Sequence, residues 1–207
     1  MQTHYQRTLP HILPPGECVF ITYRLAGSIP AAVLLRLQEE KQIALRQIGA
    51  SSMDSTATAK ARLDESKRYF AAFDNYLDTA HEGPHWLKVP SIADIIKKGI
   101  HSRHAIDYDL QAYCIMSNHV HLLVSIRETN RPFHQTLKSL KGYSARHANE
   151  LLGRTGQSFW QAESYDHVVR NHEEFKRIVA YILNNPVKAG FVDDWEKWPH
   201  SYLADGI

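Results

Sequence analysis

The stretch from Tyr113 to Val124 reads YCIMSNHVHLLV and predicts two strands joined by a tight turn. Apolar and β-branched residues flank the dipeptide Ser117-Asn118, which is typical of a hairpin turn. Side chains alternate between the two faces of a strand, so His119 and His121 are expected on one face and the aliphatic residues around them on the other. An antiparallel hairpin with two histidines on one face is the first prediction.

The segments on either side of this hairpin predict an α+β fold. Strands are predicted at 18–25, 108–116, 119–126 and 164–170, and helices at 31–49, 62–80, 91–98, 132–151 and 173–184. Residues 50–60 are small and polar and predict a flexible connector, and Asn185-Pro186 is expected to end the last helix. Without the additional helices the order is βαββαβ, a ferredoxin-like antiparallel sheet.

The length of 207 residues suits a single domain spanning 1–207. The first crossover is unusually long, which predicts a helical insertion at about 31–80. The helix after the fourth strand predicts a C-terminal helical extension.

Composition excludes several classes of protein. Hydrophobic residues make up 43% of the chain and mean hydropathy is −0.39, as in globular proteins with a substantial core. No apolar run reaches the roughly 18–20 residues of a membrane span, and residues 1–7 lack the pattern of a secretory signal. Only Cys18 and Cys114 are present, both in apolar contexts, so a disulfide framework is not expected. We therefore expect a cytoplasmic protein without a membrane partner.

Charge is distributed unevenly along the chain. The whole chain has a formal net charge of +2, whereas the stretch from 127 to 188 alone has ten Lys or Arg against six Asp or Glu. A basic C-terminal half around the histidine pair favours a phosphate-containing partner.

The histidine pair is a candidate metal site. Imidazole is a common metal ligand, and two histidines one residue apart on a strand can converge on one ion. Taken alone, this pattern is also typical of polar residues on the solvated face of a strand. Tyr143 and His147 follow four residues apart on a predicted helix, hence on one face, as a candidate nucleophile and third ligand. Tyr143 can also be an ordinary packing residue, and His147 an ordinary surface histidine.

A third cluster spans 159–170 and mixes aromatic residues with Arg170. Such a cluster can stack bases and hold a DNA backbone, or can be an ordinary strand with core aromatics. Asp166 or His167 is a candidate for orienting a metal-binding histidine. Lys138 and Lys141, on the helix of Tyr143, are candidates for binding phosphate.

The ordered set of motifs resembles the REP-associated tyrosine transposases, which are relatives of the single-tyrosine HUH transposases. The motifs are 116–122, 141–143, 160–161, 166–170 and 181–190, and the resemblance extends over about residues 10 to 195. Two positions depart from the family pattern: Ser117 replaces a proline, and His147 stands where relatives often have an amide.

The resemblance implies a metal-dependent endonuclease and strand transferase acting on single-stranded DNA beside a REP-like hairpin. In such enzymes a tyrosine forms a 5′-phosphotyrosine and frees a 3′-OH. Carried over, the nucleophile is Tyr143, and His119, His121 and His147 hold Mg²⁺ or Mn²⁺. The REP-associated branch is expected to be monomeric, whereas insertion-sequence relatives are dimers.

Two other functions stay open. A non-catalytic DNA-hairpin-binding protein derived from a transposase would bind but not cut. A metal hydrolase would use activated water in place of tyrosine and would leave no covalent species.

Overall fold

The computed structural model describes residues 4–6, 10–12, 14–80 and 82–207. The chain divides into two compact units, Met1–Ala26 with Pro84–Ile207, and Gly27–Gly83. The expected lack of a secretory signal at 1–7 falls partly outside the described residues. The interpretation of 1–207 as a single domain stays a prediction.

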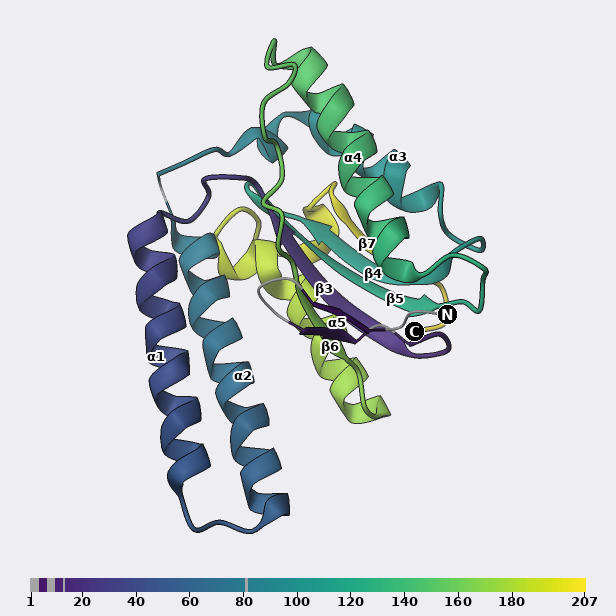
Figure 1. The fold of residues 1–207 in the computed structure, drawn as a ribbon. Helices are drawn as coiled ribbons and strands as arrows, with labels where there is room; N and C mark the ends of the chain where they lie inside the picture. Colours follow the sequence, from purple (N-terminus) through teal and green to yellow (C-terminus); the bar gives the residue numbers. More distant parts are fainter. Residues whose placement is uncertain (1–3, 7–9, 13, 81) are drawn as a thin grey trace. The chain divides into compact units, whose positions relative to one another are not determined.

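The first unit is built on a five-stranded antiparallel sheet with the strand order β6-β3-β5-β4-β7 (Figure 1). The strands are β3 (Cys18–Arg24), β4 (Tyr108–Ile115), β5 (His119–Ile126), β6 (Tyr165–Val168) and β7 (Ser201–Leu203). The helices of this unit are α3 (Pro90–His101), α4 (Phe133–Leu151), α5 (His172–Lys188) and the short η1 (Trp86–Lys88) and η2 (Trp195–Lys197). A separate two-stranded ladder joins β1 (His4–Gln6) to β2 (Pro10–Ile12).

The order of the first four sheet strands confirms the predicted ferredoxin-like arrangement. In sequence order β3, β4, β5 and β6 are the four strands of βαββαβ, with α3 and α4 as the two crossover helices. Each neighbouring pair is antiparallel, and β7 adds a fifth strand beside β4. The predicted C-terminal extension is therefore α5 together with β7.

The hydrophobic core lies between the sheet and the layer formed by α3 and α4. Alternate residues of β3 and β5 meet apolar residues of both helices in one buried cluster: Val19, Ile21, Tyr23, Val120, Leu122, Val124, Ile92, Ile96, Leu137 and Leu140. Helix α5 packs on β4, β5 and β7 from the other face (Figure 1). Strand alternation thus sends Val120 and Leu122 toward α3 and α4, and sends His119 and His121 toward α5.

Two predicted helix boundaries are wrong. Helix α5 continues through Pro186 to Lys188, although a proline there was expected to end it. Proline removes one backbone hydrogen bond and crowds the carbonyl four residues earlier, and here the surrounding structure holds the last turn of α5 despite both. In the second unit, α2 begins at Ser55 instead of near residue 62, because the Asp54 carboxylate caps it by accepting from the Ala57 N–H at 2.8 Å.

The second unit is a pair of helices, α1 (Ala31–Ala50) and α2 (Ser55–Thr79), packed against each other. Contacts within it include the Lys41 ammonium, 4.5 Å from the centroid of the Tyr69 ring. No helix among the described residues has both the length and the apolar character that a membrane span requires.

Candidate metal centre

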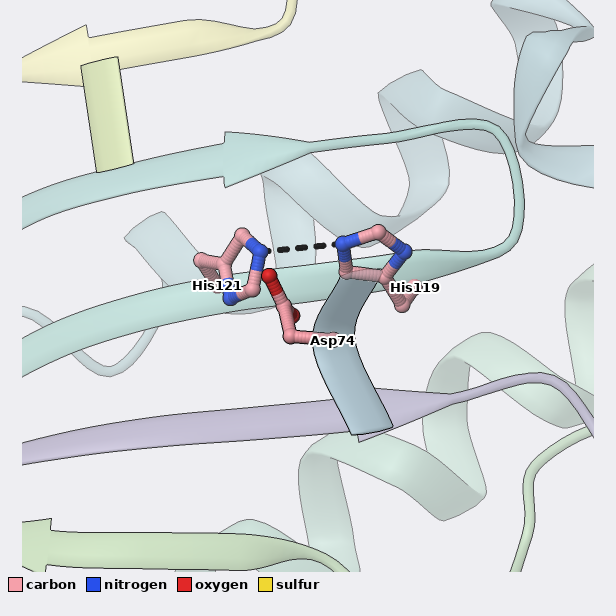
Figure 2. A group of neighbouring side chains, drawn as sticks. All are labelled: Asp74, His119 and His121. Carbon is pink, nitrogen blue, oxygen red and sulfur yellow. Dashed lines mark hydrogen bonds between the residues drawn. The ribbon is translucent and has the colours of Figure 1, made fainter. Parts of the chain in front are cut away.

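The two histidines of β5 turn their Nε2 atoms toward each other. His119 Nε2 and His121 Nε2 lie 2.9 Å apart (Figure 2). Both side chains are buried, so the interpretation of the pair as residues on a solvated strand face is wrong. Asp74, which is drawn in the same view, is a residue of helix α2 in the other unit.

Two side-chain oxygens hold the opposite sides of the imidazole rings. Asn118 Oδ1 lies 2.7 Å from His119 Nδ1, and Thr22 Oγ1 lies 2.8 Å from His121 Nδ1. Thr22 stands directly opposite His121 in the β3–β5 ladder, and Asn118 belongs to the hairpin turn that precedes β5. An amide oxygen only accepts, so His119 Nδ1 donates the hydrogen and the Nε2 atom of this ring keeps its lone pair.

Helix α5 brings an amide to the same place. Asn185 Nδ2 lies 3.0 Å from His121 Nε2, so the amide donates and this Nε2 is also an acceptor, which leaves Nδ1 to donate to Thr22. Asn185 is buried, and its Oδ1 has no hydrogen-bond partner among the described residues. Tyr181 lies one helical turn earlier, with its ring centroid 5.4 Å from that of His121.

Burial keeps both imidazoles neutral. Removal from water lowers the pKa of His119 to about 3, and the charge of Lys188 contributes to the same shift. Burial also lowers the pKa of His121 well below its ordinary value, with added contributions from His119 and Lys188. Neutral imidazole is the form that ligates metals.

This donor set fits a divalent cation. Two neutral Nε2 lone pairs 2.9 Å apart repel each other unless a positive charge lies near both. The buried Oδ1 of Asn185, which has no hydrogen-bond partner among the described residues, also costs free energy unless it receives one. His119, His121 and, once its amide turns over, Asn185 can supply two imidazole nitrogens and one carbonyl-type oxygen, which leaves positions for water or a phosphate oxygen.

Tyr143 and His147 lie away from this centre. Both are on α4, which packs with α3 on the opposite face of the sheet. Their rings contact each other with centroids 4.6 Å apart, Tyr143 is 44% exposed, and His147 Nδ1 lies 3.1 Å from Glu150 Oε2. The structure therefore does not bring either residue to the histidine pair.

The other predicted contributors also have partners elsewhere. Lys141 Nζ donates to the carbonyls of Gln161 and Ala162 at 2.7 and 3.0 Å. His167 Nε2 lies 3.1 Å from Glu174 Oε1, and Asp166 stands opposite Ile21 in the β3–β6 ladder. The side chains that hold the two histidines are those of Asn118, which the sequence indicated only as a turn residue and a member of motif 116–122, and of Thr22, which no local sequence pattern indicated.

The aromatic cluster at 159–170 begins in the core. Phe159 and Trp160 are buried members of the hydrophobic cluster, and Trp160 Nε1 donates to Ser144 Oγ at 2.9 Å. These two rings are therefore core aromatics and not base-stacking platforms.

Comparison with known proteins identifies the relatives of this chain. The family model for "Transposase IS200 like" matches residues 91–185, a range that contains both histidines and ends at Asn185. A REP-associated tyrosine transposase of Escherichia coli is 28% identical over 106 residues, which cover 48% of this chain. Over less than half of its length, the chain is similar to the REP-associated tyrosine transposases.

Two further proteins are similar to this chain. A Haemophilus influenzae protein of the same family name is 26% identical over 102 residues, or 45% of this chain. A solved REP-associated tyrosine transposase bound to a REP hairpin aligns with 97% of this chain and 82% of its own, with a TM-score of 0.48 and 19% identity. The matched region spans 61% and 58% of the lengths of the two curated transposase relatives.

Proposed function

We propose that this protein is a metal-dependent single-stranded DNA endonuclease and strand transferase that acts beside a REP-like hairpin through a 5′-phosphotyrosine. We assign the nucleophile to Tyr181, in place of Tyr143. We assign the metal ligands to His119, His121 and Asn185, in place of His147. Mn²⁺ or Mg²⁺ is the expected ion.

The observation that carries this assignment is the convergence of α5 on the histidine pair. The Asn185 amide lies against His121, with Nδ2 3.0 Å from Nε2, and its buried Oδ1 has no hydrogen-bond partner among the described residues. Tyr181 is on the same helix face one turn earlier. A phenol and a third ligand four residues apart is the arrangement expected of Tyr143 and His147. On α5, Tyr181 and Asn185 have the same spacing and lie next to His121.

The chemistry is an exchange of one phosphoester for another. The deprotonated Tyr181 oxygen attacks the phosphorus, a P–O bond to tyrosine forms, and the P–O3′ bond breaks. The 3′ oxygen leaves with the bonding electrons and takes a proton from water, so that the products are a 5′-phosphotyrosine and a 3′-OH. A bound divalent cation supplies Lewis-acid stabilisation of the charge on the phosphate oxygens.

Residues of the chain itself contribute orientation and charge. Asn118 and Thr22 fix the rings so that the Nε2 atoms face one point. Lys188 follows Asn185 on α5, and its charge is close enough to lower the pKa of both histidines. The same positive charge would stabilise a phosphodiester bound at this centre.

The DNA partner is inferred from the relatives and from charge. Both curated relatives are named for association with REP sequences, and the stretch from 127 to 188 is basic. Affinity for DNA should therefore fall as salt rises.

A monomer is the expected oligomeric state, and light scattering of the free and DNA-bound protein tests it.

The test is covalent capture. The protein is incubated with Mn²⁺ and a hairpin oligonucleotide labelled on the 3′ side of the cleavage site, and SDS-resistant adducts are separated by electrophoresis. We expect Tyr181→Phe to abolish the adduct and Tyr143→Phe to retain it. The reverse result would return the nucleophile to Tyr143.

The same experiment separates the two rival functions. A non-catalytic hairpin-binding protein would bind the oligonucleotide and leave it intact with every divalent metal. A metal hydrolase would cut it without an adduct and would continue to do so after Tyr181→Phe. The orphaned oxygen of Asn185 favours a metal centre over binding alone, since DNA binding requires no such group.

A further inference from the structure

A groove lies between α4 and the segment that precedes β6. Its volume is about 890 Å³, and its walls are the 134–145 face of α4 with Arg131 just before it, and residues 157–162 with Ser164. Both walls belong to the first unit, and α4 lies on the sheet face opposite to α5. The groove is therefore distinct from the histidine centre.

Basic side chains follow one ridge of this groove. His134, Lys138 and Lys141 of α4 line it, and their spacing of four and three residues places them on successive turns of one helix face, while Arg131 lines it from just before the helix. At 1.5 Å per residue, the helical part of the ridge from His134 to Lys141 extends over roughly 10 Å with a side chain every 5–6 Å. No Asp or Glu is among the described residues that line the groove.

This repeating charge fits a polyanion better than a single anion. Lys138 is exposed, whereas Lys141 holds the opposite wall through the carbonyls of Gln161 and Ala162. Neutral donors from Gln135 and Ser139 lie between the basic side chains. Phe159 and Trp160 are buried, so the groove has cations for a backbone and no exposed ring for bases.

The groove reaches the end of the sheet at which the histidine centre lies. Its 159–161 wall is bonded to the end of β3: the Ala26 N–H donates to the Phe159 carbonyl and the Gln161 N–H to the Arg24 carbonyl. The Leu25 N–H in turn donates to the carbonyl of Asn118, whose side chain holds His119. A single DNA strand that leaves the histidine centre can therefore continue into the groove around this end of the sheet.

We propose that the groove binds the phosphate backbone of single-stranded DNA next to the cleavage site, an inference that rests on the proposed function. Lys138 and Arg131 contact phosphates, and the binding is independent of base sequence. The groove adds affinity for the unpaired strand without taking part in bond cleavage.

The test is the charge reversal Lys138→Glu with Lys98→Glu as the matched control. Lys98 is an exposed lysine on α3 that does not line the groove. Binding of a labelled 20-nucleotide unpaired strand and of a blunt hairpin is measured by fluorescence anisotropy in EDTA at several salt concentrations. Thermal melts of each variant check that the fold is intact.

We expect Lys138→Glu to weaken binding of the unpaired strand about tenfold, as for loss of one charge-assisted contact. The slope of log affinity against log salt should decrease by roughly 0.7 per lost phosphate contact. Lys98→Glu should stay within about twofold of wild type.

Three results would overturn the groove proposal: equal losses in both variants, no loss in Lys138→Glu, or a loss confined to the blunt hairpin. Because binding is measured in EDTA, none of them depends on cleavage. Adduct formation through Tyr181, measured with Mn²⁺, decides the proposed function separately.

Discussion

The two faces of the central sheet use the same strand in opposite ways. On the α3 and α4 face, Val120 and Leu122 of β5 are fully buried among aliphatic and aromatic side chains. On the α5 face, His119 and His121 are equally buried, but their ring nitrogens are held by oxygens and an amide. One face stabilises the fold, and the other buries a polar centre.

This difference shows how the alternation of side chains along β5 produces a rigid site. The aliphatic face fixes β5 in the sheet, because sliding the strand by one residue would expose its core side chains. The histidines on the other face are thereby fixed in place without contributing to the core themselves. A polar cluster of this kind is tolerable when its groups are hydrogen-bonded or ligate a metal.

The largest expected effect is on stability, from the aliphatic face. Leu122→Ala should lower the free energy of unfolding by roughly 2–5 kcal/mol, because it leaves a cavity in a well-packed core. Urea unfolding measures this loss. Leu151→Ala is the control, since Leu151 is 60% exposed and should change stability by less than about 0.5 kcal/mol. Equal losses would mean that this face is not the core.

The next effect is on the polar face and on metal affinity. Asn185→Ala should weaken Mn²⁺ binding at least about tenfold, the scale seen even for residues that only support a ligand. The neighbouring Asn184→Ala is the control, because Asn184 is exposed and its Nδ2 donates to the Ala180 carbonyl of its own helix. Calorimetric titration gives both affinities. Unchanged affinity in Asn185→Ala would remove this amide from the ligand set.

The histidine face should also make stability depend on pH. The pKa of His119 is lowered to about 3 in the folded protein, so below about pH 6.5, the ordinary pKa of histidine, the unfolded chain binds its proton first. The contribution of His119 to the free energy of unfolding is therefore fully present above about pH 6.5 and is lost as pH falls toward 3. At pH 5 the loss from this residue alone is about 2 kcal/mol. Chemical denaturation in EDTA at pH 7 and pH 5 measures it. A flat profile would contradict the burial of neutral imidazoles.

The smallest effect concerns the residues that support the ligands. Thr22→Val keeps the shape of the side chain but removes the oxygen at His121 Nδ1. We expect Mn²⁺ affinity to fall about tenfold as the ring loses its fixed orientation. Thr136→Val is the control, because Thr136 is buried on α4 and its Oγ1 has no hydrogen-bond partner among the described residues. Equal effects of the two changes would argue against a role for Thr22 in holding the ring.

Much of the scaffold could be predicted from local patterns. The hairpin around Ser117-Asn118, the strand at 119–126 and the βαββαβ order depend on periodicity and turn chemistry, which neighbouring residues supply. The helix boundary at Pro186 could not be predicted in this way, because proline is unfavourable in a helix unless packing holds the turn. The motif 181–190 contains both Tyr181 and Asn185, but a helix that ends at residue 184 leaves Asn185 off the helix face of Tyr181.

The sequence by itself determined which side chains share a face of a strand or a helix, since those relations repeat every two residues or every three to four. It could not determine which helix meets which face. Tyr143 with His147 and Tyr181 with Asn185 have the same spacing, and only the packing of α5 on the β4, β5 and β7 face brings the second pair to His121, 64 residues away from Asn185. The contact depends on the closure of the whole sheet, and no local pattern encodes it.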